Sequence, residues 1–311
     1  MSDALKPAPF VVGVGRSGTT LLRLMLDAHP ELAIPPETHF LPALIDLWSH
    51  HREPSADEQV ATVQTHPGWR DFGLSEAELR ASFAASVDSL PPGGTQTTLG
   101  EERGAAAAIR AFYGAYAARH SKPRWGDKTP VYIESIATIG ETLGTQARFI
   151  HLIRDGRDVA VSRGARAVKR GREATPARDE ADTWKRRIEG ARTQATRVDH
   201  YFELRYEDLI AHPEAALRRV CDHSELEFDP AMLDYHEHAE ERLSELSDLP
   251  GNGGKVRPGS ERIAAHALTS EPPRADRIER WRTELNAAAI ADYEEAAGDL
   301  LAELGYPVTQ R

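Results

Sequence analysis

The segment Gly13-Val-Gly-Arg-Ser-Gly-Thr-Thr20 has the composition of a turn that binds an anion. An apolar run over residues 9–14 leads into it and a leucine-rich run over residues 19–26 follows, so it joins a predicted strand to a predicted helix. Backbone N–H groups in such a turn point into one concavity at the positive end of the helix dipole, which favours a phosphate or a group of similar shape. The spacing approaches the nucleotide-binding pattern GxxxxGK[ST], but Thr19 replaces the lysine and the loop's cation is Arg16. An ordinary tight turn is the alternative.

A second anion-binding pattern begins at Arg154, directly after another apolar run, residues 148–153. An arginine at the carboxyl end of a strand lies where open α/β sheets bind their ligands. Ser162 follows a little over two helical turns later, so both side chains could converge on one oxyanion. Residues 154–172 hold seven basic and two acidic side chains, a local charge of +5. This run favours an anion-binding surface, with a solvated basic helix as the alternative.

The elements that must position these residues alternate along the chain. A third strand is predicted over residues 200–206, with helices over 103–120, 131–143 and 179–198 and a pair of closing helices within 275–304. This alternation predicts a parallel α/β sheet. Two polar regions rich in proline or glycine interrupt it, at about 50–100 and 243–273. We expect them to be excursions from the sheet that carry substrate contacts.

Composition excludes several other classes. The 311 residues include 38 basic and 49 acidic side chains, a net charge of −11, and 40% are hydrophobic. These values argue against a disordered chain and against a non-specific nucleic-acid binder. Cys221 is the single cysteine, which excludes an intramolecular disulfide and a cysteine-cluster metal site. No signal peptide and no apolar run of membrane-spanning length can be drawn, so we expect a cytoplasmic protein without a membrane span; no oligomeric state is predicted.

The two anion-binding motifs resemble those of the sulfotransferases that use 3'-phosphoadenosine 5'-phosphosulfate (PAPS). Arg16-Ser-Gly-Thr-Thr20 resembles their 5'-phosphosulfate loop in its arginine-bearing form, found in Golgi-type, protein-tyrosine and many bacterial members, and Ile153 to Ser162 resembles their 3'-phosphate motif. The resemblance continues in Leu204-Arg-Tyr-Glu-Asp-Leu209 and in Gly254-Lys-Val-Arg-Pro-Gly259. It implies an α/β, P-loop-like three-layer fold with a short central parallel sheet flanked by helices, in a single domain over residues 1–311.

The resemblance also implies a set of donor-binding residues. In this family the phosphosulfate loop, the 3'-phosphate motif, a tyrosine beside the adenosine and a C-terminal loop together hold the donor. The corresponding residues are Arg16, Ser17, Gly18, Thr19 and Thr20 for the 5'-phosphosulfate, Arg154 and Ser162 for the 3'-phosphate, Tyr206 for the adenosine, and Lys255 or Arg257 closing over the 3'-phosphate.

Two further segments supply candidate catalytic residues. In Pro35-Pro-Glu-Thr-His-Phe40, family members with this kind of loop often carry a glutamate, which makes Glu37 the candidate base, with His39 as competitor because imidazole titrates near pH 6.5. A helix N-terminal acid is the alternative for Glu37. Lys128, in a predicted loop before a helix, resembles the family's lysine that reaches the sulfuryl oxygens and the bridging oxygen. A solvated surface lysine is its alternative.

The implied reaction is in-line transfer of the sulfuryl group of PAPS to an acceptor hydroxyl, which releases 3'-phosphoadenosine 5'-phosphate (PAP). Loop N–H groups, Arg16 and Lys128 would stabilise the developing charge, so no metal is required. The acceptor is a small molecule, a glycan or a peptide, and sulfation of an amine or of protein tyrosine stays open. The rival functions are a P-loop kinase with a degenerate phosphate loop and a non-catalytic anion-binding module.

Overall fold

The computed structural model describes residues 5–51, 53–88, 98–250 and 256–309. Its centre is a four-stranded sheet in the order β4-β1-β5-β6, and every pairing is parallel. The strands are β1 (Ala8–Val12), β4 (Asp127–Lys128), β5 (Ala147–Ile153) and β6 (Tyr201–Arg205). Every residue of β1 and β5 is buried, which explains why both strands are largely apolar in the sequence.

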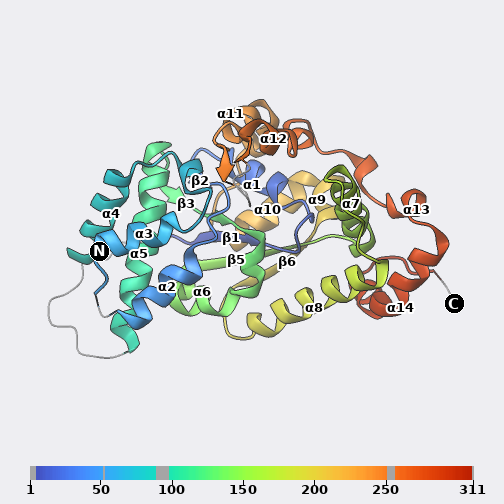
Figure 1. Ribbon diagram of the computed structural model, residues 1–311, viewed down its shortest axis with the longest axis horizontal. Helices are drawn as coiled ribbons and strands as arrows, with labels where there is room; N and C mark the ends of the chain where they lie inside the picture. The colour runs from blue at the N-terminus through green and yellow to red at the C-terminus, as the bar shows by residue number, and fades with distance from the viewer. Residues whose placement is uncertain (1–4, 52, 89–97, 251–255, 310–311) are drawn as a thin grey trace.

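Two hydrophobic clusters cover the two faces of this sheet. Successive strand residues point to opposite faces, so Phe10 and Phe149 join one cluster whereas Val11 and Ile150 join the other. The first cluster packs against α2 (Leu41–His50), α5 (Thr98–Arg119), α6 (Ile136–Leu143), α8 (Ala177–Ala195) and α14 (Ala287–Glu303). The second packs against α1 (Thr19–Asp27), α9 (Tyr206–Ala211) and α10 (Pro213–His223), on the other side of the sheet in Figure 1. The three-layer α/β prediction is therefore confirmed.

Several predicted elements have different bounds in the structure. The helix predicted over 131–143 begins as a 3₁₀ turn, Pro130–Glu134, and becomes α6 only at Ile136. The predicted closing pair consists of a 3₁₀ turn, Ala275–Arg277, the short α13 (Trp281–Glu284) and the long α14. One further helix, α7 (Gly156–Lys169), follows β5.

Both excursions contain regular structure. The first holds α3 (Ala56–Gln64), α4 (Glu76–Asp88) and the start of α5, so it is helical despite its prolines. The second follows α11 (Ala239–Leu243) and holds β7 (Leu249–Pro250), β8 (Val256–Arg257) and α12 (Gly259–Ala264). In Figure 1, α11 and α12 are at the top of the view, above α1. A separate two-stranded parallel sheet pairs β2 (Leu32–Ala33) with β3 (Arg124–Trp125). No helix in the described parts of the chain is long and apolar enough to cross a membrane.

Candidate active site

The glycine-rich loop turns sharply between β1 and α1. Arg16 and Gly18 both have left-handed backbone, with φ of 84° and 94°. Gly18 has no room for a side chain, because a Cβ there would lie 2.5 Å from the ring of Tyr206. The N-terminus of α1 has no side-chain cap, and the buried Ser17 hydroxyl has no hydrogen-bond partner in the described structure. An uncapped helix N-terminus beside an unpaired hydroxyl fits a bound oxyanion such as a phosphosulfate.

The second motif converges on this loop. Arg16 Nε donates to Ser162 Oγ at 3.1 Å, and Arg154 Nη1 donates to the Arg16 carbonyl at 3.3 Å. Arg154 is 6% exposed and its guanidinium lies 4.6 Å from the ring centroid of Tyr206. Arg154 and Ser162 thus both contact Arg16, one at its carbonyl and the other at its side chain. Tyr206 reaches the site as the first residue of α9, immediately after β6.

More cations line the same region than the two motifs supply. Burial lowers the pKa of Arg166 on α7, and repulsion from Arg170 and Arg16 lowers it further. Burial likewise lowers the pKa of Arg257 on β8, and repulsion from Arg170 lowers it further. Glu37 and Glu261 offset only part of the repulsion among these positive groups, so this surface attracts anions. Lys255, the other candidate of this segment, lies outside the described residues.

Lys128 is on a strand, so its predicted place in a loop was wrong. The two residues of β4 pair in register with Phe10 and Val11, and a strand this short has no sequence periodicity. The Lys128 side chain is 4% exposed, which excludes the solvated-lysine alternative. Its Nζ donates to Glu37 Oε1 at 2.7 Å and lies 3.5 Å from Thr20 Oγ1. The lysine thus bridges the candidate base and the phosphosulfate loop.

Glu37 belongs to this site and not to a helix terminus. It precedes α2 and is outside the first turn, which contains no acidic residue. Its packing alone would raise its pKa, but the Lys128 ammonium and a hydrogen bond from His39 outweigh that effect and hold the pKa well below its usual range. His39 Nε2 is 3.1 Å from Glu37 Oε2. A carboxylate only accepts hydrogen bonds, so Nε2 carries the proton of this contact.

Behind the Glu37–Lys128 pair is a polar network that sequence reasoning missed. The Oδ2 atom of the fully buried Asp127 accepts hydrogen bonds from Thr38 Oγ1, Tyr113 OH and Thr129 Oγ1 at 2.9, 2.8 and 3.2 Å. The Thr38 N–H also donates to Thr129 Oγ1 at 2.9 Å. Burial raises the pKa of Asp127 to about 6, although these donors oppose it. Thr38 follows Glu37, and Asp127 and Thr129 flank Lys128, so the network fixes the backbone on both sides of the pair. Adjacency to those two candidates is the sequence signal that could have found it.

Two further histidines, His66 and His266, lie near Glu37. The ring of His66, which follows α3, lies 4.9 Å from the ring of His39, centroid to centroid. Burial lowers the pKa of His66 to about 4, and His39 contributes to the lowering. His266, after α12, is a second histidine near the site that sequence reasoning did not select. Its pKa falls to about 3 through burial and repulsion from Lys128. Both rings are therefore neutral at neutral pH.

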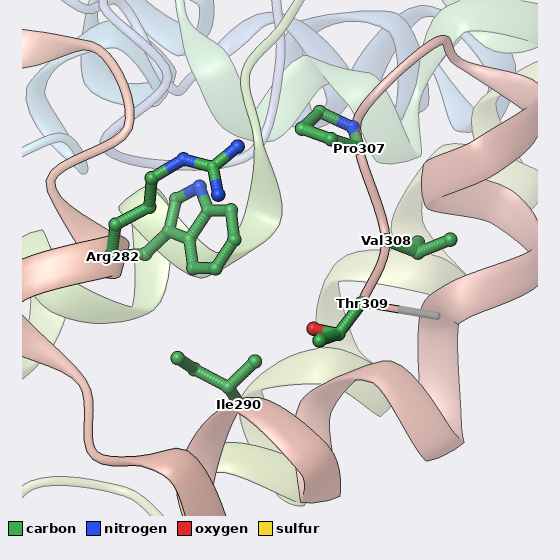
Figure 2. A pocket seen from close by; sticks show the side chains of 6 residues that line it. Arg282, Ile290, Pro307, Val308 and Thr309 are labelled. Carbon is green, nitrogen blue, oxygen red and sulfur yellow. The ribbon is translucent and has the colours of Figure 1, made fainter. Parts of the chain in front are cut away.

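Two cavities lie outside this arrangement. Figure 2 shows one of about 270 Å³, lined by residues of α13, α14 and the C-terminal segment, including Arg282, Ile290 and Val308. The other, of about 620 Å³, is lined by the N-terminal segment and by residues such as Arg124 and Glu227. No residue of the glycine-rich loop, of α7 or of the Glu37 segment lines either one, so neither belongs to the candidate active site.

Comparisons with known proteins point to one family. The family model described as the sulfotransferase family matches residues 7–230. Protein-tyrosine sulfotransferase of Drosophila melanogaster is 26% identical over 305 residues, which is 96% of this chain and 52% of the relative. Protein-tyrosine sulfotransferase A of Caenorhabditis elegans is 27% identical over 303 residues, 96% of this chain and 67% of the relative. The chain thus spans about half the length of the first relative and about two thirds of the second.

Solved structures show the same fold. The sulfotransferase domain from the curacin biosynthetic pathway has a TM-score of 0.62 at 18% identity, covering 99% of this chain and 100% of that one. The sulfotransferase domain of the Synechococcus PCC 7002 olefin synthase has a TM-score of 0.57 at 23% identity, covering 99% and 98%. Since the family model covers more than half of the sequence and the motifs meet at one edge of the sheet, this chain belongs to the sulfotransferase family.

Proposed function

We propose that this protein transfers the sulfuryl group of PAPS to an acceptor hydroxyl and releases PAP. The observation that carries the proposal is the meeting of three chain segments at the carboxyl ends of β1, β4 and β5. The uncapped loop with Arg16, the Arg154–Ser162 motif, and the Glu37–Lys128 pair lie next to one another there. A donor with a phosphate at one end and a phosphosulfate at the other needs two anion sites side by side, and the two motifs are the candidates for them.

PAPS, when bound, supplies the sulfuryl group. The loop N–H groups and Arg16 hold the 5'-phosphosulfate, and Arg154 with Ser162 holds the 3'-phosphate. Lys128, whose Nζ is 3.5 Å from Thr20 Oγ1, would bind the sulfuryl oxygens. These fixed donors and cations stabilise charge on the leaving phosphate oxygen without a metal, because side chains provide the positive charge.

The acceptor oxygen forms a bond to sulfur as the bond from sulfur to the phosphate oxygen breaks, and the acceptor proton passes to Glu37. Lys128 and His39 contact the two carboxylate oxygens of Glu37. When Lys128 turns towards the donor, it leaves Oε1 for the acceptor hydroxyl, and the packing around Glu37, no longer fully opposed, raises its pKa. Glu37 thereby becomes a stronger base when the donor is in place. His39 keeps its hydrogen bond and orients the carboxylate.

The relatives named protein-tyrosine sulfotransferases support a peptide acceptor over a small molecule or a glycan. We therefore place the phenolic hydroxyl of a peptide tyrosine first among the acceptors. A phenol is also more easily deprotonated than an aliphatic alcohol, which suits a carboxylate base.

Labelled PAPS offered with tyrosine peptides, phenols, alcohols, sugars and amines, all in chelator, tests this function. We expect label on hydroxyl acceptors, with the tyrosine peptide foremost. Glu37→Gln should abolish most transfer while calorimetry still detects PAP binding. The matched control is Glu214→Gln, at an exposed glutamate that pairs with Arg218 on α10. Binding of ATP with magnesium but not of PAP would refute the proposal in favour of the kinase, and full activity of Glu37→Gln would remove Glu37 as the base.

A further inference from the structure

His39 occupies a strained position beside the candidate base. Its backbone is left-handed, with φ of 57°, and the Phe40 N–H donates to the Thr38 carbonyl at 2.7 Å, which closes a three-residue turn around it. A histidine in this conformation costs free energy, so the surrounding contacts must hold it there. Thr38 is held by Asp127, and Phe40 is buried in the first hydrophobic cluster. Both neighbours of His39 are therefore fixed, and the turn presents the His39 ring to Glu37.

The His39 ring itself is less tightly enclosed than this backbone. Its side chain is 35% exposed, and its Nε2 contacts Glu37 Oε2 at 3.1 Å. The ring also packs beside that of His66, with 4.9 Å between centroids and 35° between the planes. One hydrogen bond sets a distance but leaves the imidazole plane free to turn about it, whereas a second ring packed beside the first restricts the plane. The contact with His66 therefore helps to set the direction in which Nε2–H points.

His66 is itself held in place by the first excursion. Its N–H donates to the Val63 carbonyl of α3 at 3.1 Å, and its own carbonyl accepts from the Trp69 N–H at 3.0 Å. Its ring lies 6.1 Å, centroid to centroid, from that of Phe72, which is 1% exposed. A Cβ at Gly68 would lie 2.8 Å from His66 Nε2, so the glycine leaves the space that the ring occupies.

The rings continue from this point into the interior. Phe72 packs edge-on against Phe112 of α5, with 5.1 Å between centroids. The next residue, Tyr113, donates its hydroxyl to the buried Asp127 at 2.8 Å. A series of ring contacts therefore runs from the partner of Glu37 to the polar network that fixes the backbone on both sides of the Glu37–Lys128 pair. We call this series the ring column, and its members are His39, His66, Phe72 and Phe112.

The charge state of His66 suits a place in this column. Burial lowers its pKa to about 4, so the ring is neutral at neutral pH. A neutral ring restricts His39 without adding positive charge near Glu37, which Lys128 already keeps ionised. A cation in the same place would make Glu37 a weaker base. The site therefore uses the ring of His66 and not its charge.

We infer that His66 is a positioning residue that holds the His39 imidazole in the orientation in which Nε2–H donates to Glu37. This inference rests on the proposed function, because it assigns the effect to Glu37 as the base. His66 needs no contact with donor or acceptor in this role. It acts through His39, which orients the carboxylate so that the other oxygen can take the acceptor proton. The first excursion thereby contributes to the chemistry of the site as well as to its walls.

Steady-state transfer of label from PAPS to a tyrosine peptide tests this role. His66→Ala should lower kcat about three- to tenfold, the value of one ring contact, whereas the KM for PAPS and the affinity for PAP change by less than about twofold. His66→Phe keeps a ring and should retain at least about half of the wild-type kcat. The matched control is His50→Ala, at an exposed histidine of α2 that pairs with Asp46, and its kcat should equal that of wild type. Unchanged kcat in His66→Ala, or an equal loss in His66→Phe, would overturn the inference.

A double-mutant cycle shows whether His66 acts through His39. The variant that combines His39→Ala with His66→Ala should be no slower than His39→Ala alone, and losses that multiply in full would contradict the inference. If His66→Ala does not fold, Gly68→Ala takes its place. That variant keeps the imidazole but puts a methyl group 2.8 Å from the present position of its Nε2, so the ring must shift and kcat should fall. Unchanged kcat in Gly68→Ala would then overturn the inference.

NMR of the imidazole nitrogens gives a readout that does not depend on turnover. Long-range proton–nitrogen spectra of wild type should show His39 as the Nε2–H tautomer, and His66→Ala should show nitrogen shifts averaged between the two tautomers. A single Nε2–H tautomer in His66→Ala would contradict the inference. Failure of wild type to transfer label to any acceptor would overturn the proposed function itself, whereas an active wild type with an unaffected His66→Ala overturns only the role of His66.

Discussion

The buried carboxyl of Asp127 makes the stability of this protein depend on pH in a predictable direction. Its pKa rises from 3.8 to about 6 because burial disfavours the charged form. The folded state therefore binds more protons than the unfolded state between about pH 4 and pH 6. The stabilising contribution of the neutral acid is fully present below about pH 4 and is lost as the pH rises through about 6. At about 1.4 kcal/mol per pKa unit, the loss amounts to about 3 kcal/mol.

Asp127→Asn isolates this effect. The amide does not titrate, and its oxygen can take the place of Oδ2, which accepts all three hydrogen bonds. Its NH₂ then occupies the Oδ1 position, which has no partner in the described structure, at a cost of about 1–3 kcal/mol at every pH. The unfolding free energy of the variant relative to wild type should therefore rise by about 3 kcal/mol between pH 4 and pH 7.

Urea unfolding followed by tryptophan fluorescence at a series of pH values measures this difference curve. Tyr113→Phe provides an independent variant, because it removes the 2.8 Å hydrogen bond that lowers the Asp127 pKa. The pKa should rise further, so this variant should lose more stability at pH 7 than at pH 5. A flat difference curve for Asp127→Asn, or one that falls with pH, would refute the argument that burial dominates the site.

Three other substitutions, the first with a matched control, probe the active site. Gly18→Ala should lower the free energy of unfolding, measured with urea, by about 1–3 kcal/mol, because φ is positive and the Tyr206 ring fills the space of a Cβ. Gly15→Ala in the same loop is the control, because a Cβ there meets open space, and it should change the free energy of unfolding by less than about 0.5 kcal/mol. Lys128→Met should raise the pKa of Glu37, seen by NMR titration of its carboxyl carbon, and an unchanged value would show that the ion pair does not control it. Arg154→Met should weaken the binding of PAP about 10- to 100-fold, measured by calorimetry, but leave the binding of 5'-AMP almost unchanged. Equal losses of affinity for both nucleotides would contradict a contact between Arg154 and the 3'-phosphate.

The parts of the site that follow a long strand could be predicted from the sequence. Strands β1 and β5 are buried on both faces, so their apolar runs end visibly where the polar motifs begin. The segments after them, with Arg16 and Arg154, must meet because parallel strands present their carboxyl ends at one edge. Arg16 contacts both residues of the second motif, through its carbonyl to Arg154 and through its Nε to Ser162, and the convergence of Arg154 and Ser162 on one oxyanion stays a prediction.

Residues positioned by distant or very short segments could not be predicted in this way. Lys128 lies on a two-residue strand that exists only because β1 pairs with it. The hydrogen bond from Thr38 to Asp127 joins residues 89 positions apart, and the pair of Asp71 with Arg262 spans 191 positions. No local pattern encodes such contacts. Glu37 was selected through family resemblance, and the structure adds the physical reason, a carboxylate held between an ammonium and an imidazole.

The crowding of Arg16, Arg166, Arg170 and Arg257 has a practical consequence for anyone who purifies this protein. Glu37 and Glu261 offset only part of the repulsion among these guanidinium groups, so we expect the site to bind sulfate or phosphate from the buffer. A ligand present at about 100 times its dissociation constant stabilises a fold by about 2.7 kcal/mol. Ammonium sulfate should therefore preserve the protein during storage, while the same salt carried into an assay would compete with the nucleotide and make its affinity look weaker than it is.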